Sequence, residues 1–191
     1  DFEFDPKDYL YFRIDRRRKM PVTTLLKALG LSSEEILSTF YDFENFHVKS
    51  KKASMELVPE RLRGEISKRD YKDKKGNLIV AKEKRITAKH VREIENKASL
   101  IIPVVPEDYI GKKIAKAIVD TETGEVIAET NAEITEELFE KILESGVDSF
   151  NTLYSNDLDH GDYISQTLST DEVPDQYSAQ VAIYRMMRPG E

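Results

Sequence analysis

Residues 73–80 read DKKGNLIV and residues 120–128 read DTETGEVIA, so one turn-and-strand pattern occurs twice in the chain. Ten residues after the glycine of each copy stands an Ile-Thr pair, ending in Thr87 or Thr135. Threonine is a good N-cap, because its hydroxyl accepts a hydrogen bond from a first-turn N–H group. Each copy is therefore predicted to form a strand, a glycine turn, a second strand and a capped helix.

The two copies define an internal repeat. We place the units at residues 64–98 and 111–146, with first strands at 65–71 and 112–119. A single hairpin with one helix buries only one face, so we expect the two units to pack together into one small α+β body. Chance similarity between two generic hairpin–helix units is the alternative.

Residues 1–42 predict a β-hairpin followed by two short helices. Aromatic and β-branched residues flank a proline turn at 5–8, which is typical of a hairpin. Leucines at helical spacing follow Pro21 as far as Gly30, and Ser32 with Glu35 forms a capping box for a second helix. The second strand of the hairpin ends in a basic run that contains one carboxylate: Arg13, Asp15, Arg16, Arg17, Arg18 and Lys19.

The C-terminal part of the chain also predicts helix. Tyr177, Val181 and Tyr184 lie on one stripe of a helix at 175–187, which Pro189 and Gly190 end. Because this helical pattern resembles that of the first segment, we expect one domain built from residues 1–42 and 153–191. Residues 43–152 then form an inserted domain. The predicted fold class is α+β: a helical and β-hairpin domain made from both chain ends, interrupted by two β-hairpin–helix units.

The composition excludes several classes of protein. The 191 residues carry a net charge of −7 and include no cysteine, so disulfides, thiolate metal sites and cysteine nucleophiles are absent. No apolar run approaches the roughly 18–20 residues of a membrane helix. We expect a cytoplasmic protein without a membrane partner. The chain begins with Asp1 rather than Met, so we also expect a piece of a longer protein.

Residues 156–162, NDLDHGD, are the best metal candidate. A calcium loop does not fit this segment. With Asp157 counted as position 1, Gly161 falls at position 5 rather than 6, and position 12 is Leu168 rather than Glu. A metal hydrolase using Asp157, Asp159 and His160 would need further ligands, and a helix-capping loop explains the segment with less. No nucleophile elbow or phosphate-binding glycine loop is present in the sequence, so we expect no complete active site.

The basic run at 13–19 is the remaining candidate. Arginine binds phosphate with two parallel hydrogen bonds, and such contacts position a protein on DNA without reading sequence. Asp15 differs chemically, because a carboxylate accepts hydrogen bonds from the amino and imino groups of an exposed guanine edge. The alternative for Asp15 is an internal salt bridge with the arginines, and for the run as a whole a solvated turn.

Several segments resemble the β subunit of bacterial DNA-directed RNA polymerase, in the two halves of its lobe (β2) domain. The segments DFEFDPKD (1–8), RIDRRRKMP (13–21) and IYRMMRPGE (183–191) carry this resemblance. The segments MELVPERLRG (55–64) and NDLDHG (156–161) resemble the form found in lineages that carry a large insertion in the lobe. The likeness covers essentially the whole chain in order, and the central repeat matches less well.

The resemblance implies a non-catalytic lobe that lines the DNA cleft of a nucleotidyltransferase and takes part in transcription. It implies as partners the non-template strand, the downstream duplex, the other polymerase subunits and a sigma factor, with regulators as further candidates on the insertion. The family's guanine-contacting Asp falls on Asp15, and an Arg of the same pocket falls on Arg188, with Arg185 as the alternative. Arg16, Arg17 and Arg18 are candidates for DNA phosphate contacts by our electrostatic argument.

The resemblance implies no cofactor in this chain, because the catalytic Mg²⁺ belongs to the other large subunit. The insertion would serve as a spacer or as a docking surface. The competing interpretation is a free-standing, protein-binding scaffold without a nucleic-acid role, in which the arginines are merely solvated.

Overall fold

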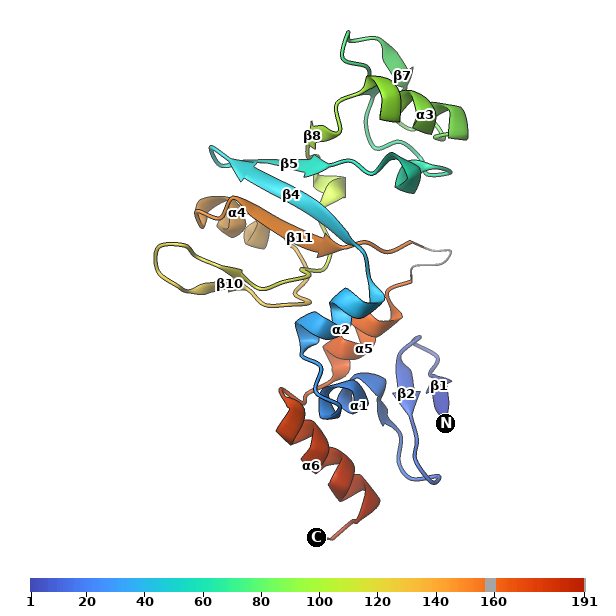
Figure 1. The fold of residues 1–191 in the computed structure, drawn as a ribbon, viewed down its shortest axis with the longest axis vertical. Helices are drawn as coiled ribbons and strands as arrows, with labels where there is room; N and C mark the ends of the chain where they lie inside the picture. The colour runs from blue at the N-terminus through green and yellow to red at the C-terminus, as the bar shows by residue number, and fades with distance from the viewer. Residues whose placement is uncertain (157–160, 191) are drawn as a thin grey trace.

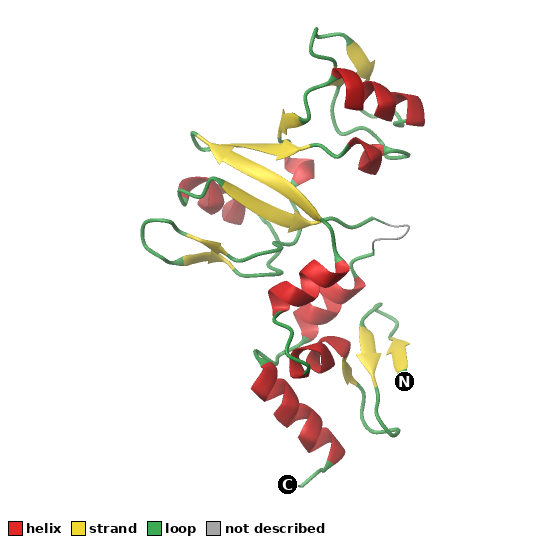
Figure 2. Cartoon of the chain, viewed as in Figure 1, coloured by secondary structure: helices red, strands yellow, loops and turns green. Residues whose placement is uncertain are grey.

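The computed structural model describes residues 1–156 and 161–190, which form an elongated molecule (Figure 1). A helical body with a small hairpin lies at the end that holds both termini, and an antiparallel sheet lies in the middle. A hairpin with one helix lies at the far end. This mixture of helices and small antiparallel sheets confirms the predicted α+β class (Figure 2).

The chain starts with the hairpin that its aromatic pattern predicts. Its strands form one antiparallel sheet: β1 (Phe2–Phe4), β2 (Leu10–Phe12) and β3 (Met20–Pro21). In the β1–β2 turn, Asp5 Oδ1 accepts hydrogen bonds from the backbone N–H of Lys7 and Tyr9, at 2.9 and 3.0 Å. A turn closed by an aspartate in this way fixes the connection between the strands.

Two helices follow the hairpin: α1 (Val22–Ala28) and α2 (Ser33–Phe40). The predicted capping box begins α2, since Ser32 Oγ accepts from the Glu35 backbone N–H at 3.1 Å and the Glu35 carboxylate accepts from the Ser32 N–H. Ile36 and Leu37 of α2 are completely buried. The local signal therefore places the start of α2.

The buried face of α1 differs from its leucine spacing. Leu29, one residue beyond the helix, is 71% exposed, whereas Thr23, Thr24 and Lys27 are buried. The reason lies in the elements that cover α1, because the polar side chains of Thr23 and Lys27 meet a buried carboxylate, Asp171.

Both ends of the chain contribute to one helical body. The C-terminal helices are α5 (Tyr163–Thr170) and α6 (Gln176–Met187); α1 packs against both of them and α2 packs against α5. Buried side chains from both ends form one core cluster, which also takes in Ala115 from the middle of the chain: Val22, Ile36, Leu37, Tyr41, Ala115, Leu153, Ile164 and Leu168.

The tyrosine stripe of α6 does not face this core. Tyr177 is 75% exposed and Tyr184 50% exposed, while Ala179 is completely buried. On the same side as the α1–α6 contact, the side-chain amides of Gln176 and Gln180 donate to the Ala28 carbonyl at 3.3 and 3.1 Å. A close approach of two helices favours a small residue, so Ala179 rather than a tyrosine occupies the contact.

The middle of the molecule is a four-stranded antiparallel sheet. In spatial order its strands are β11 (Ser149–Leu153), β4 (Phe43–Lys49), β5 (Lys52–Glu56) and β8 (Ile101–Pro103). Phe46 of β4 and Phe150 of β11 stack with ring centroids 4.8 Å apart. Beside the paired ends of β4 and β11, the Tyr154 N–H donates to the Asp42 carbonyl at 2.9 Å, so the chain enters and leaves this region at one point.

The repeat appears as two hairpin–helix units of the predicted kind. The first consists of β6 (Tyr71–Lys72), β7 (Leu78–Val80) and α3 (Ala88–Lys97). The second consists of β9 (Ile118–Val119), β10 (Val126–Ala128) and α4 (Glu136–Glu144). Short 3-10 turns precede each unit: η1 (Pro59–Leu62) and η2 (Pro106–Asp108).

Both predicted threonine caps are present. Thr87 Oγ1 accepts from the His90 N–H at 3.3 Å, and Thr135 Oγ1 accepts from the Leu138 N–H at 3.2 Å. The two hairpin turns also match each other, because an aspartate accepts backbone hydrogen bonds in each. In the first turn, hydrogen bonds from backbone N–H groups, mainly that of Asn77, hold the pKa of Asp73 below its usual range. Those of Glu122 and Thr123 lower the pKa of Asp120 in the same way.

The first strands are shorter than predicted. Only 71–72 and 118–119 are strands, instead of 65–71 and 112–119. The preceding residues still run beside the Ile-Thr segments, because the Gly64 N–H donates to the Ile86 carbonyl and the Gly111 N–H to the Ile134 carbonyl, at 2.8 and 2.9 Å. Each unit is thus a partly irregular hairpin wrapped around its helix.

The two units do not share one core, contrary to expectation. The first unit packs its own cluster with Leu57, and the second packs on the four-stranded sheet with Phe46 and Phe150. The sheet supplies the apolar surface that we expected each unit to supply for the other. Arg69 of the first unit pairs with the buried Asp108 of η2, which joins the first unit to the segment that precedes the second.

Candidate nucleic-acid interface

The loop between β2 and β3 holds the basic run. The Arg17 N–H donates to the Ile14 carbonyl at 2.9 Å, which closes a tight turn. Within it, Asp15 and Arg16 have φ values of 48° and 58°, in the left-handed region. This region is tolerable for aspartate but unfavourable for arginine, so the modest strain of the turn falls mainly on Arg16.

The side chains of this loop point to solvent. Asp15, Arg16, Arg17 and Arg18 are all exposed. Among the described residues no side-chain hydrogen bond or ion pair engages these four, whereas Arg13 pairs with Glu3 at 3.1 Å. The internal salt bridge considered for Asp15 is therefore not formed in the described structure. As far as the described residues show, the loop presents one carboxylate and three guanidinium groups whose hydrogen-bonding atoms are not engaged by other side chains.

Arg185 and Arg188 lie at the C-terminal end of α6. Both are exposed, and the Arg188 guanidinium lies 5.9 Å from the centre of the Tyr184 ring. This end of α6 and the β2–β3 loop lie at the same end of the long axis (Figure 1). Within the described residues, no hydrogen bond or ion pair links Asp15 to either arginine. Burial does not separate the two arginines as candidates.

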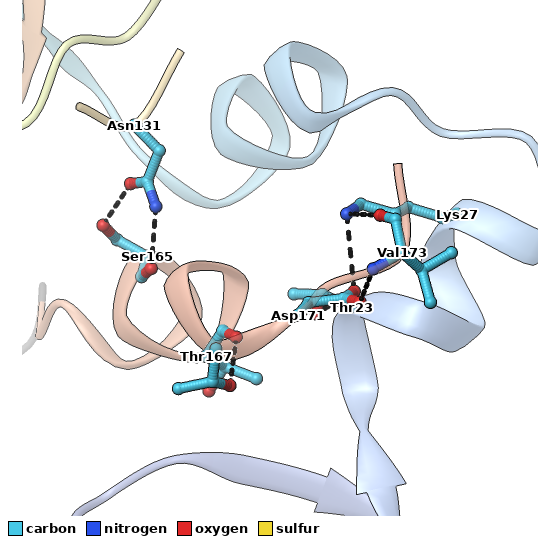
Figure 3. Close-up of polar contacts among 8 residues, drawn as sticks. Thr23, Lys27, Asn131, Ser165, Thr167, Asp171 and Val173 are labelled. Carbon is cyan, nitrogen blue, oxygen red and sulfur yellow. Dashed lines mark hydrogen bonds and ion pairs between the residues drawn. The ribbon is translucent and has the colours of Figure 1, made fainter. Parts of the chain in front are cut away.

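A buried polar cluster fixes α1 relative to the α5–α6 connection (Figure 3). Asp171, whose side chain is 1% exposed, accepts from the Thr23 hydroxyl at 2.8 Å and pairs with Lys27 Nζ at 3.5 Å. Lys27 Nζ also donates to the Val173 carbonyl, and the Val173 N–H donates to Asp171 at 2.9 Å. This cluster fixes the start of α6 relative to α1. It therefore also influences the position of Arg188, which follows the last residue of α6.

Two other segments are attached to α5, and Figure 3 shows the attachment between Asn131 and Ser165. The backbone N–H of Leu10 in β2 donates to Thr167 Oγ1 at 2.8 Å, which holds the hairpin against α5. The side-chain amide of Asn131, in the second unit, donates to the Ser165 carbonyl and to Ser169 Oγ, both at 3.0 Å. The scaffold behind the loop is therefore built from segments far apart in the chain.

Sequence reasoning missed this scaffold. Thr23, Lys27, Asn131, Ser165 and Asp171 are polar residues of ordinary types, and their partners lie 34 to 148 positions away in the chain. The leucine spacing of α1 gives no signal for Thr23 and Lys27, because it assigns the buried face to other positions.

The residues that the structure describes include no group of three or more His, Cys, Asp or Glu side chains able to hold a metal ion. Asp157, Asp159 and His160, the candidates for a metal hydrolase, lie outside the described residues. No helix in the described ranges is long and apolar enough to cross a membrane.

A comparison with protein families identifies the class of protein. The family model described as RNA polymerase Rpb2, domain 2 matches residues 1–100, and since this is more than half of the chain, the chain belongs to that family. This family represents the lobe of the second-largest subunit of a DNA-directed RNA polymerase. The chain is therefore part of a nucleotidyltransferase complex that acts in transcription. The partners that follow from this membership are the other polymerase subunits and DNA.

The matched range runs from the hairpin to the first unit. It includes Asp15 and the arginines 16–18, whereas Arg185 and Arg188 lie beyond it. The family assignment supports the part of the resemblance that concerns the lobe of an RNA polymerase second-largest subunit, and it argues against a free-standing scaffold.

Proposed function

We propose that this chain is the lobe of a bacterial β subunit, interrupted by an inserted domain at residues 43–152. The shared core of α1, α2, α5 and their connections supports a domain built from both chain ends. The hydrogen bond from Tyr154 to Asp42 supports an insertion that enters and leaves at one point. The lobe lines the DNA cleft of a cytoplasmic enzyme without taking part in the chemistry, alongside the other subunits and a sigma factor. The insertion serves as a spacer or as a docking surface for regulators.

Within this lobe, the β2–β3 loop contacts the non-template strand. The observation that carries the proposal is the exposed Asp15 carboxylate with unoccupied acceptor oxygens among three exposed arginines. Asp15 accepts hydrogen bonds from an unpaired guanine, and Arg188 approaches the same base from the end of α6. Arg16, Arg17 and Arg18 bind backbone phosphates of the non-template strand or the downstream duplex.

Replacing Asp15 with alanine in the assembled polymerase is expected to weaken the preference for guanine at one position of the transcription bubble. Loss of hydrogen bonds to a charged group costs about 1.5–3 kcal/mol. The measurement is the dissociation rate of complexes that carry each of the four bases at successive non-template positions. In the same scan Arg188→Ala should reproduce the loss and Arg185→Ala should not.

The control for Asp15→Ala is Asp8→Ala. Asp8 is also exposed and also has a positive φ, of 63°, but it lies in the β1–β2 turn. Asp8→Ala should leave the base preference unchanged. Equal guanine preference in the wild type and in Asp15→Ala would contradict the proposed role.

Neutralising the three arginines tests the phosphate contacts separately. The triple change of Arg16, Arg17 and Arg18 to glutamine should flatten the dependence of DNA affinity on salt, by up to about 0.9 per lost phosphate contact in the log–log slope. The affinity of the assembled polymerase for DNA is measured over a series of salt concentrations. Lys7→Gln, in the exposed turn of the hairpin, is the control, and an unchanged slope in the triple variant would reject these contacts.

A further inference from the structure

The two units of the repeat carry opposite charge. Residues 64–98 contain 11 Lys and Arg against 6 Asp and Glu, a net charge of +5. Residues 111–146 contain 4 against 9, a net charge of −5. The basic first unit lies at the end of the molecule far from the β2–β3 loop (Figure 1).

The charge difference is sharpest at aligned positions. Aligned on their capping threonines, the units share buried residues at each core position of the helix and its entry: Ile86 and Ile134, Val91 and Phe139, Ile94 and Ile142. At three exposed positions next to these core residues, a cation of the first unit aligns with a glutamate of the second: Arg85 and Glu133, Lys89 and Glu137, Arg92 and Glu140. The same local fold therefore forms with either charge on this face.

This reversal separates folding from function. Because the second unit folds with Glu133, Glu137 and Glu140, the fold itself does not require arginine or lysine at 85, 89 and 92. Exposed cations that the fold does not require are available to bind an external anion.

The cations of the first unit are also available. Among the described residues no ion pair engages Lys89 or Arg92, and Arg85 makes one hydrogen bond, to the Gly64 carbonyl at 2.7 Å, which leaves its other donors free. Six more exposed lysines of this unit likewise form no ion pair within the described structure: Lys68, Lys72, Lys74, Lys75, Lys82 and Lys84. The exposed side of α3 presents no large apolar side chain.

We propose that the first unit binds the phosphate backbone of duplex DNA through Arg85, Lys89 and Arg92. Protein–protein interfaces are depleted of lysine and rich in buried aromatic and apolar anchors, and this face has the opposite character. Exposed cations of this kind bind backbone phosphates, and such contacts do not depend on sequence. The chain belongs to an RNA polymerase family, so duplex DNA is a polyanion that the assembled enzyme binds. This contact is separate from that of the β2–β3 loop.

The test exchanges charges between the two units in the full chain, assembled into the polymerase. The reversed variant carries Arg85→Glu, Lys89→Glu and Arg92→Glu, each the residue at the aligned position of the second unit. The exchanged variant adds Glu133→Arg, Glu137→Lys and Glu140→Arg, which restores the net charge of −7. Affinity for a fluorescent duplex without a promoter is measured over a series of salt concentrations.

The reversed variant should lower the log–log salt slope by about 2–3, because each phosphate contact contributes about 0.9. The exchanged variant should bind as weakly as the reversed one, since the position of the cations matters. An unchanged slope in the reversed variant would overturn the proposal and favour an acidic protein surface as the partner. Full recovery in the exchanged variant would also overturn it, by showing that only net charge matters.

Two features keep the result interpretable. Circular dichroism and thermal unfolding check that the variants fold, and Arg85→Gln, Lys89→Gln and Arg92→Gln form a milder set with the same expected direction. The guanine scan at Asp15 reads base preference, whereas this test reads sequence-independent affinity. Failure of one therefore does not imply failure of the other.

Discussion

Replacing Asp171 with alanine is expected to destabilise the helical body by about 3–5 kcal/mol, the usual cost of breaking a buried ion pair from one side. The Asp171 side chain is 1% exposed and that of Lys27 is 5% exposed. Without the carboxylate, the Lys27 ammonium remains buried with the Val173 carbonyl as its partner, and the Thr23 hydroxyl and Val173 N–H lose theirs. The measurement is urea unfolding of the chain, followed by circular dichroism.

Two comparisons test whether burial of the charge causes this loss. The double variant Lys27→Met, Asp171→Leu should recover most of the stability, because replacing both charges removes the desolvation cost as well as the attraction. Glu144→Ala breaks an exposed pair with Lys51, whose N···O distance is 2.9 Å, and should change stability by less than about 1 kcal/mol. A loss below about 1 kcal/mol in Asp171→Ala would show that the cluster is not a major constraint.

The same cluster links stability to the proposed DNA contact. Asp171 lies in the connection that delivers α6, and Arg188 stands at the end of α6. If this connection loosens, Arg188 moves relative to the β2–β3 loop while Asp15 stays on its own hairpin. The position of Arg188 in the proposed contact is therefore expected to depend on Asp171, which is buried away from that contact.

Local signals predicted the elements of the fold well. The capping box at Ser32, the caps at Thr87 and Thr135 and the turns at Gly76 and Gly124 all depend on residues within a few positions of one another. Such contacts form from the adjacent sequence, and the structure shows each of them. The spacing of these signals was enough to reveal the repeat.

Long-range partners could not be predicted in the same way. Thr23 and Lys27 meet Asp171 across more than 140 positions, and nothing in their neighbourhoods marks them as buried. The stripe on α6 shows the limit of periodicity, which predicts an amphipathic helix but not which side packs. The close contact with α1 selected Ala179 and left the tyrosines exposed.

In the candidate site, too, the sequence predicted the local features and not those that depend on the three-dimensional structure. The sequence placed Asp15 and its arginines in a turn at the end of a strand, and they lie there. The residue types of the run predict neither the left-handed backbone at Asp15 and Arg16 nor the lack of an internal partner for Asp15 in the described structure. Only the three-dimensional structure shows these features.

Phe46→Ala is expected to destabilise the middle of the molecule by about 3–5 kcal/mol, the range for truncating a buried phenylalanine. Phe46 has no exposed surface and stacks on Phe150 with an angle of 7° between the rings. Its removal leaves a cavity between the four-stranded sheet and the second unit, because the side chain belongs to the core cluster that the two share. Phe40→Ala, at a position 47% exposed, is the matched control and should cost much less.

The location of the effect tests whether the three core clusters behave as separate units. Hydrogen exchange should show lost protection in β4, β11 and α4, because their buried side chains surround Phe46 or lie in its cluster. α3 packs in a different cluster, around Leu57 and Ile86, and should keep its protection. Equal loss of protection in α3 would mean that the clusters unfold together. Retained protection in α3 would mean that the first unit stays folded when the four-stranded sheet is destabilised. The proposed DNA contact of the first unit requires this independence, because all of its residues lie within that unit.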